Sequence, residues 1–315
     1  MLDQTSPSLE SMQKSILGAL QKIEKIIVGK PQQIKLAVCC LLSSGHILIE
    51  DLPGVGKTTL SHALAKVFGL NFSRIQFTSD LLPADILGVS IFDPKSQQFS
   101  FHPGPIFSNC VLADEMNRAT PKTQSALLEA MEERQITIDG STKQLQEPFF
   151  VIGTQNPLDQ SGTFPLPESQ LDRFMMKLNL GYPDEKAERE LLAGQSRQHL
   201  IKNLQAAITT DSLLQIQQSV EAVHVSEALL DYIQLLIAET RNKQLFVYGL
   251  SPRAALSLLK AARAWALMNG RDFVEPGDVK AVFSAISSHR LIPTEQHSKS
   301  SGSLVDNLLQ QIAIP

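Results

Sequence analysis

The chain contains few cysteines, and none of them is placed for chemistry. Cys39, Cys40 and Cys110 make an odd number, and each lies in an apolar run. We interpret them as reduced core residues, which suits a reducing compartment better than a disulfide framework. A catalytic thiol is the alternative, but no histidine partner is placed for one.

Long apolar segments and a secretory leader are also missing. The longest apolar runs, such as Ile34–Leu42, are too short to span a bilayer. Residues 1–15 have neither the basic start nor the apolar stretch of a secretory signal. We therefore expect no membrane span and a soluble, cytoplasmic protein.

An excess of basic charge is the third absence. The formal net charge is −4, so there is no overall basic footprint for nucleic acid, although a local basic patch stays open. Hydrophobic residues make up 43% and charged residues 19% of the chain, which are ordinary globular fractions. A length of 315 residues allows a large core and predicts two domains.

The first half of the chain alternates short apolar runs with helical patterns. Between about Gly45 and Leu178, this alternation predicts a parallel sheet flanked by helices. The predicted strands are Ile47–Ile49, Val111–Ala113 and Phe149–Ile152, and the helical stretches include Thr58–Phe68 and Lys122–Arg134.

From about Asp184 onward the pattern predicts helices only, and no strand is expected. The predicted helices are Glu185–Leu192, Ser212–Val220, Glu227–Arg241, Pro252–Met268 and Pro276–Ser287. Residues 181–184, Gly-Tyr-Pro-Asp, form the expected hinge. The sequence thus predicts an α/β domain over residues 1–181 and an all-α domain over residues 182–315, with a loose polar tail at His297–Ser303.

Two segments interrupt the α/β half with hairpin patterns. Ser90–His102 has turn residues at 93–97, and Gln135–Leu145 has Asp139-Gly140 as its turn. Their tips carry Lys95 and Lys143, but basic and aromatic residues are little interleaved there, so single-stranded nucleic acid is a poor match.

The strongest chemical motif is a glycine-rich turn between an apolar run and a helix. In Asp51–Thr58, Gly54 and Gly56 let the backbone aim successive N–H groups at phosphate oxygens. The following helix start adds the positive end of its dipole. Lys57 can reach the β- and γ-phosphates, and the Thr58 hydroxyl can ligate Mg²⁺. Asp51 stands where the loop consensus has glycine.

Two acids end a buried run downstream of this loop. In a phosphate-loop protein, an aspartate at a neighbouring strand end holds the Mg²⁺, which assigns Asp114 to the metal. The next acid, Glu115, can orient and deprotonate the attacking water.

Three further polar residues have two interpretations each. Asn156 follows another buried run and can contact the γ-phosphate or the water, or can simply cap the turn before Pro157. Arg173 and Arg253 can stabilise the charge of phosphoryl transfer. Without a family pattern, however, an ordinary surface or interdomain ion pair is the favoured interpretation of each. Ser251 and Pro252 are typical of a helix start just before Arg253.

Together these motifs resemble the AAA+ ATPases, and within them the MoxR family. The matching segments lie between about Val28 and Arg290 and cover nearly the whole chain. They are Glu50–Thr58, Arg74–Asp85, Asp114–Ala119, Gly153–Pro157, Pro165–Phe174 and Gly249–Arg253. Aspartate at position 51, in place of the consensus glycine, resembles the loop sequence of this family.

The resemblance implies an α/β nucleotide domain with a small helical lid, binding ATP and Mg²⁺. Asn156 would be sensor 1, Arg253 the sensor 2 of the lid, and Arg173 the finger that completes a neighbour's site. The hairpins would be the helix-2 insert and the pre-sensor hairpin. The implied nucleotide-binding residues are Val28, Gly29, Pro53, Gly54, Val55, Gly56, Lys57, Thr58 and Thr59, with Thr58 and Asp114 at the metal.

The family resemblance also implies biology that the residues do not display. It implies a homo-oligomer in a hexameric ring that acts like a chaperone on protein complexes. A partner with a von Willebrand factor A domain is expected, and nucleic acid is not. Two alternatives stay open, a DNA-directed AAA+ motor and the ATPase subunit of a metal chelatase.

Overall fold

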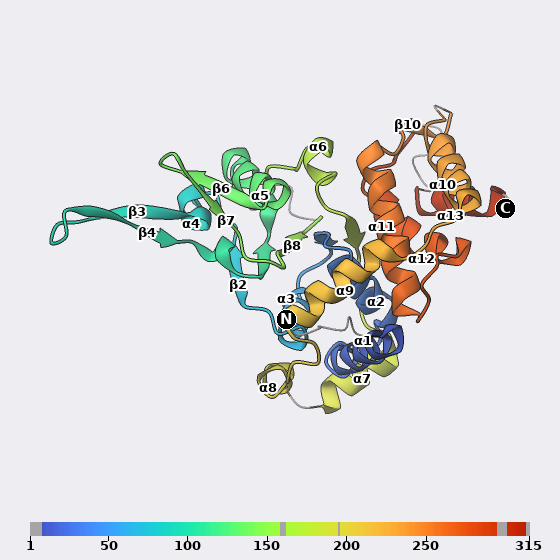
Figure 1. Ribbon diagram of the computed structural model, residues 1–315, viewed down its shortest axis with the longest axis horizontal. Coiled ribbons are helices and arrows are strands. Elements are labelled where there is room, and N and C mark those ends of the chain that lie inside the picture. The colour runs from blue at the N-terminus through green and yellow to red at the C-terminus, as the bar shows by residue number, and fades with distance from the viewer. Residues whose placement is uncertain (1–7, 158–161, 195, 243, 295–300, 313–315) are drawn as a thin grey trace, which may run out of the picture.

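The computed structural model describes residues 8–157, 162–194, 196–242, 244–294 and 301–312 (Figure 1). Its centre is a five-stranded parallel sheet in the order β2-β5-β8-β1-β9. The strands are β1 (Ile47–Glu50), β2 (Phe72–Gln76), β5 (Cys110–Asp114), β8 (Phe150–Gln155) and β9 (Met176–Leu178). The predicted α/β fold with a helical C-terminal half is confirmed.

Both faces of the sheet are covered, because alternate residues of each strand point to opposite sides. Ile47 and Ile49 face a cluster with α1 (Leu9–Glu24), α2 (Pro31–Leu42) and α3 (Lys57–Val67). Leu48 faces a second cluster with α4 (Pro83–Leu87) and α5 (Pro121–Glu133). Burial on both faces explains why the central strands are almost wholly apolar.

Strands β2 and β9 are absent from the sequence-based prediction. β2 is an edge strand in which only Ile75 is buried, so its sequence, Phe-Ser-Arg-Ile-Gln, lacks the apolar run of a central strand. β9 has three residues and includes Lys177, which forms an ion pair with Glu50 on β1. Their polar side chains are accommodated because an edge strand has a neighbour on one side only.

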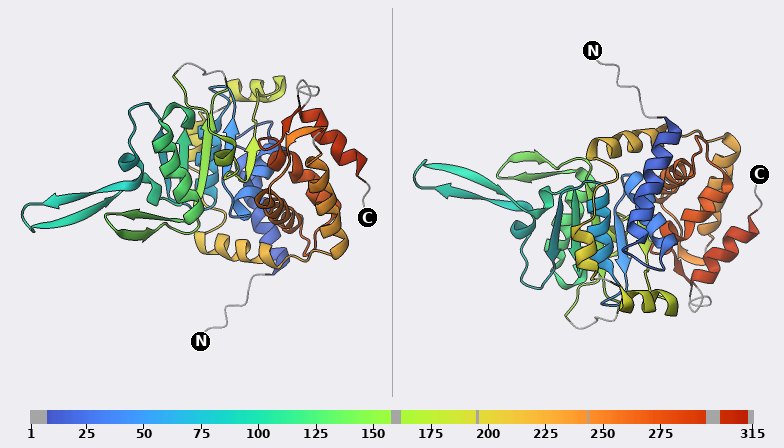
Figure 2. Two further views of the ribbon diagram at one scale, coloured as in Figure 1. Left: turned by 90° about the horizontal axis from the view of Figure 1, so that it is seen from above. Right: turned by 90° about the horizontal axis from the view of Figure 1, so that it is seen from below.

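Both predicted hairpins are present. β3 (Gly88–Asp93) pairs with β4 (Gln98–Pro103), and β6 (Gln135–Ile138) pairs with β7 (Ser141–Gln144). Asp139 and Gly140 have φ of 50° and 75°, as a two-residue hairpin turn requires. The β3–β4 hairpin extends far from the body of the molecule in every view (Figures 1 and 2).

Where the structure describes it, the C-terminal half is helical except for one small sheet. Its helices are α7 (Glu185–Ala193), α8 (Arg197–Lys202), α9 (Thr210–Ala222), α10 (Glu227–Thr240), α11 (Pro252–Met268), α12 (Pro276–Ser287) and α13 (Ser301–Gln311), and the short α6 (Glu168–Leu171) lies before β9. The Ser251 hydroxyl caps α11 by accepting the Ala254 N–H at 3.1 Å.

Two expectations for this half are wrong. β10 (Phe246–Tyr248) pairs antiparallel with β11 (Ile292–Pro293), although no strand was expected after Asp184. The runs are two and three residues long, too short to show alternation. Residues 301–303 of the predicted loose tail begin α13, and 297–300 lie outside the described residues.

One hydrophobic core joins the N-terminal helices to the C-terminal ones. Cys39 Sγ on α2 lies 3.3 Å from the carbonyl oxygen of Ala261 on α11, and Gln217 on α9 donates to the Leu41 carbonyl at 2.8 Å. In Figure 2 the orange helices lie beside the blue ones. The division into domains at residue 181 stays a prediction, and this core crosses it.

The three cysteines are buried and free, as predicted. Burial raises the pKa of the Cys39 and Cys110 thiols to about 12, and it raises the pKa of Cys40 as well. A thiol that stays protonated is a poor nucleophile, so the catalytic-thiol alternative fails.

Acid is expected to destabilise the fold through His46. Its Nδ1 accepts the Val151 N–H at 3.0 Å, and Nε2 lies 3.2 Å from the Met131 carbonyl, so the buried ring is held neutral. Burial, followed by the charge of Arg134, lowers its pKa to about 4. The unfolded chain takes up a proton near pH 6.5 and the folded chain does not. The free energy of unfolding should therefore fall by about 2 to 3 kcal/mol as pH drops from 6.5 to about 4.

Urea denaturation at several pH values measures this dependence. His46→Gln should reduce the pH dependence, of which buried His289 supplies a further part with the same sign because burial lowers its pKa to about 3. His102→Gln, which removes an exposed histidine from β4, should leave the dependence unchanged. An equal slope in His46→Gln and the wild type would contradict the assignment of acid sensitivity to His46.

Candidate functional site

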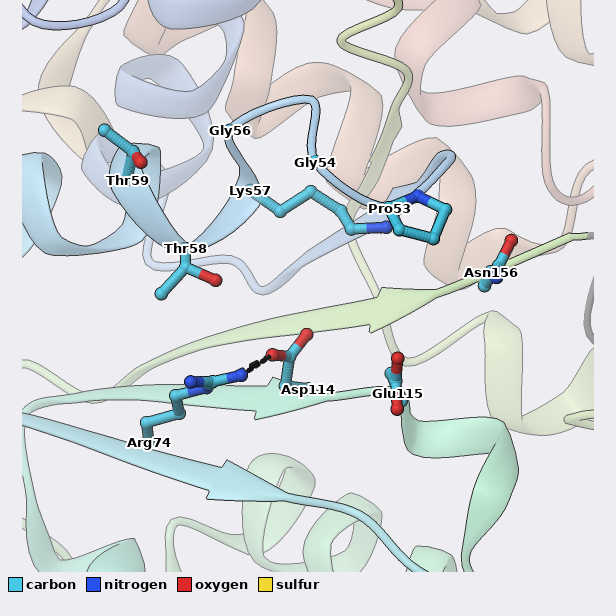
Figure 3. A pocket seen from close by; sticks show the side chains of 10 residues that line it. All are labelled: Pro53, Gly54, Gly56, Lys57, Thr58, Thr59, Arg74, Asp114, Glu115 and Asn156. Atoms are coloured by element: carbon cyan, nitrogen blue, oxygen red, sulfur yellow. Dashed lines mark hydrogen bonds and ion pairs between the residues drawn. The ribbon is translucent and has the colours of Figure 1, made fainter. Parts of the chain in front are cut away.

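A cavity of about 320 Å³ opens at the carboxyl ends of the strands. In open α/β sheets this edge is the usual place for ligands. Figure 3 shows side chains from a glycine-rich loop facing side chains from three neighbouring strands and the residues just after them. The lining residues are Pro53, Gly54, Gly56, Lys57, Thr58, Thr59, Arg74, Asp114, Glu115 and Asn156.

The loop between β1 and α3 has the backbone of an anion site. Gly54 and Gly56 have φ of 85° and 100°, a region that favours glycine. Helix α3 begins at Lys57, so its first N–H groups and the positive end of its dipole face the cavity. The Lys57 ammonium donates to the carbonyls of Asp51 and Leu52 across the loop, the latter at 3.2 Å.

Asp51 ties this loop to the expected hinge. Its carboxylate is buried and accepts the Leu52 N–H at 2.8 Å and the Gly181 N–H at 2.6 Å. A glycine at this position could not make these bonds. The departure from the loop consensus therefore has a structural role, which sequence analysis did not assign.

Asp114 ends β5 beneath the loop. One carboxylate oxygen accepts the Thr154 hydroxyl at 2.6 Å, and the other accepts the Arg74 guanidinium at 2.6 and 3.1 Å. Thr58, at the start of α3, lies across the cavity from this carboxylate (Figure 3). A carboxylate and a hydroxyl beside a phosphate-binding loop are oxygen ligands of the kind that Mg²⁺ takes.

Glu115 has a left-handed backbone with φ of 57°. For a residue other than glycine this conformation is unusual and costs about 1 kcal/mol or more. The Thr154 hydroxyl accepts the Glu115 N–H at 2.9 Å and thereby helps to hold it. The turn directs the carboxylate to the cavity edge, where Gln76 donates at 2.8 Å and Arg118 lies 3.0 Å away.

Asn156 follows β8 and lies at the same edge of the sheet (Figure 3). The residue is 7% exposed, and its side chain lines the cavity beside Glu115. The structure thus brings Asn156 together with the loop and with both acids.

Arg74 and Gln76 also belong to this site, although the sequence analysis gave them no role. Both lie on the edge strand β2, which was not predicted. Arg74 contacts Asp114, and Gln76 contacts Glu115. The Arg74 guanidinium also donates to the Gln76 side-chain oxygen at 2.8 Å. An alternation of polar residues in 72–76 was the available signal, because it places Arg74 and Gln76 on the same face.

The two predicted arginines lie together elsewhere. Arg173 donates to the Leu128 carbonyl at 2.7 Å and pairs with Glu132 on α5 at 2.6 Å. Arg253 at the start of α11 pairs with the same glutamate and lies 3.9 Å from Asp172. Neither side chain lines the cavity described above. Their roles at a γ-phosphate stay predictions.

A second cavity of about 200 Å³ adjoins the first and shares Gly54, Gly56 and Thr59 with it. Val28 and Val55 line its apolar side, as expected of a base pocket. Gly29 has φ of 75°, and a Cβ there would lie 2.7 Å from Ala187 Cβ. Contributions from the hinge and from the helices after it were not predicted; the residues concerned are Pro183, Leu191 and Arg197.

Comparisons with known proteins agree with this geometry. Residues 46–176 match the ATPase family associated with various cellular activities (AAA), and residues 238–311 match the AAA lid domain. The chain is 47% identical to the uncharacterized protein YeaC of Bacillus subtilis, over 88% of this chain and 87% of that one.

Two further relatives cover nearly the whole chain. Chaperone MoxR1 of Mycobacterium tuberculosis is 40% identical over 94% of this chain and 81% of its own. The crystal structure of an ATPase candidate from Cytophaga hutchinsonii superposes with a TM-score of 0.87 at 37% identity, covering 98% and 97% of the two chains. The chain therefore belongs to the MoxR family of AAA+ ATPases.

Proposed function

We propose that the protein hydrolyses ATP to ADP and phosphate in the cavity between the glycine-rich loop and the strand ends. The observation that carries the proposal is the position of Asp114 and Glu115, which face a phosphate-binding loop across one cavity. The loop N–H groups and Lys57 would bind the β- and γ-phosphates. The adjoining cavity lined by Val28 and Val55 would take the base.

Mg²⁺ fits the oxygen ligands that this cavity offers. Thr58 and Asp114 would hold the ion, which usually keeps several waters and binds one or two carboxylates together with substrate phosphates. When bound, it would neutralise charge on the transferred phosphoryl group. The Thr154 hydroxyl would keep the Asp114 carboxylate oriented throughout.

Glu115 would orient the attacking water and accept its proton. Its carboxylate is held at the cavity edge by Gln76 and Arg118, so it is directed before substrate arrives. Asn156 would hydrogen-bond the γ-phosphate or the same water. Arg173 would complete the site of a neighbouring subunit, and Arg253 would contact the γ-phosphate as sensor 2.

Lys57→Ala should abolish tight ATP binding. The triphosphate would lose the main cation that the loop itself supplies to the β- and γ-phosphates. Isothermal titration calorimetry with ATP measures the affinity. Lys66→Ala is the matched control, because it removes a lysine from the other end of α3. Wild-type affinity in Lys57→Ala would refute the assignment of the loop.

We further propose a homo-oligomeric, hexameric ring that remodels or matures protein complexes. Support comes from the family and from the relative that is named a chaperone. A partner with a von Willebrand factor A domain belongs to the same proposal. So does a cytoplasmic location, which three buried free thiols favour. Within the described residues, no helix is long and apolar enough to cross a membrane.

A further inference from the structure

Arg74 forms an ion pair with Asp114, the carboxylate that the proposed function assigns to the metal. Its Nε and Nη2 donate to the same oxygen of Asp114, at 3.1 and 2.6 Å. Figure 3 shows the guanidinium inside the cavity, between β2 and the strand that carries Asp114. A cation is thus already bound where the ion is expected to be held.

The partners of Asp114 leave little negative charge for a second cation. Thr154 donates to one oxygen and Arg74 to the other, and the carboxylate side chain is only 10% exposed. A divalent ion approaching this carboxylate meets the positive guanidinium at short range, well within the distance over which dissolved salt screens charges. Free Mg²⁺ would therefore bind weakly while Arg74 stays in place.

Arg74 also has freedom to leave. Its side chain is 47% exposed, and besides Asp114 it donates to the neutral amide oxygen of Gln76 at 2.8 Å. The triphosphate would bring oxygens into the same cavity, and phosphate oxygens are good acceptors for a guanidinium. ATP therefore offers Arg74 an alternative partner at the moment when Asp114 is needed for the ion.

We propose that the ion pair between Arg74 and Asp114 prevents Mg²⁺ from binding the carboxylate in the absence of nucleotide. When Mg²⁺ and ATP bind together, Arg74 would move from Asp114 to the triphosphate. It is a positioning residue that couples metal binding to nucleotide binding. This inference rests on the proposed function of the same cavity. The predicted effects are distinctive because they have opposite signs: removing Arg74 should raise the affinity for the divalent ion and lower the affinity for ATP.

Arg74→Gln tests the proposal with the two ligands taken separately. Affinity for Mn²⁺ alone, measured from the electron paramagnetic resonance signal of the free ion, should rise about tenfold. Affinity for ATP in EDTA, measured by calorimetry, should fall about tenfold, since the metal-free triphosphate loses a charged donor. Neither readout depends on turnover.

Arg118→Gln is the matched control. Arg118 is 45% exposed and lies 3.0 Å from Glu115, so its removal deletes the same charge beside the other acid. It should leave Mn²⁺ affinity near the wild-type value. In Arg74→Gln/Asp114→Asn the gain in Mn²⁺ affinity should disappear, because the carboxylate that was freed is gone.

Equal Mn²⁺ affinity in Arg74→Gln and the wild type would overturn the proposal, and so would a gain of the same size in Arg118→Gln. A fall in both affinities would show that Arg74 only braces the site. A wild type that binds no ATP would instead contradict the proposed function.

A melting curve shows whether Arg74→Gln folds. If it does not fold, Arg74→Lys replaces it in both titrations. Lysine keeps the positive charge but loses the two-donor geometry of arginine, so both affinities should change less but with the same signs.

Discussion

Arg173→Ala is expected to lower ATP turnover by about 10³-fold while ATP binding is retained. A phosphoryl-transfer site open to water lacks one cation, and an arginine supplied by a neighbouring subunit gives a gain of this order. Arg173 pairs with Glu132 within its own subunit, and it does not line the cavity beside Lys57. Steady-state phosphate release and nucleotide titration together measure the two effects.

Glu132→Gln distinguishes a finger from a local ion pair. This change removes the carboxylate partner that Arg173 shares with Arg253 but keeps both guanidinium groups. If Arg173 only stabilises its own subunit, Glu132→Gln should reduce turnover as much as Arg173→Ala. If Arg173 acts on a neighbour, turnover in Glu132→Gln should be far less affected.

Mixing two inactive variants tests the subunit contact directly. Arg173→Ala keeps an intact phosphate loop and Lys57→Ala keeps an intact arginine, so mixed rings should recover activity above the sum of the two. Specific activity of the wild type should also rise with protein concentration. Light scattering under the assay conditions measures the oligomeric state. A monomer whose specific activity does not depend on protein concentration would contradict the role of Arg173.

Glu115→Gln should lower turnover by roughly 10²-fold or more, the scale of a positioned general base, and ATP binding should survive. Glutamine keeps the size of the side chain, but the proton acceptor and the ion pair with Arg118 are lost. Single-turnover hydrolysis and ATP titration measure the two quantities.

Glu133→Gln is the control for this change, because it removes an exposed carboxylate at the end of α5. Turnover there should match the wild type. Normal hydrolysis by Glu115→Gln would mean that Glu115 is only an acid at a strand end. If the proposal holds, this variant should also retain bound ATP and its protein partner, so co-purification with it would identify the client.

The sequence predicted the parts of the fold in which one physical signal dominates. Buried central strands such as β8 are almost wholly apolar, and α11 begins at a capping serine followed by proline, so both were found. β2 was missed because an edge strand tolerates Ser73 and Arg74. β10 and β11 were missed because their pairing joins residues about 45 positions apart, which no local pattern reports.

The same limit applies to the site. Gly54, Gly56 and Lys57 act through local backbone geometry, and their spacing alone predicted the loop. Arg74 enters the cavity only because β2 pairs with β5 in the register that sets Arg74 opposite Leu112 and Gln76 opposite Asp114. Such contacts depend on tertiary register, so the polar alternation in 72–76 could place Arg74 and Gln76 on one face but could not name their partners.

The core that joins α2 to α9 and α11 constrains the order in which the protein can be completed. The ribosome delivers α2 early, but the helices that cover its buried face follow roughly 170 to 230 residues later. Until then the side of α2 that packs against α9 and α11 stays uncovered, and long-range contacts of this kind form slowly. The nascent chain would thus expose a large apolar surface while already carrying every strand of the sheet. A protein that we propose assists other complexes would, during its own synthesis, itself be a substrate for chaperones.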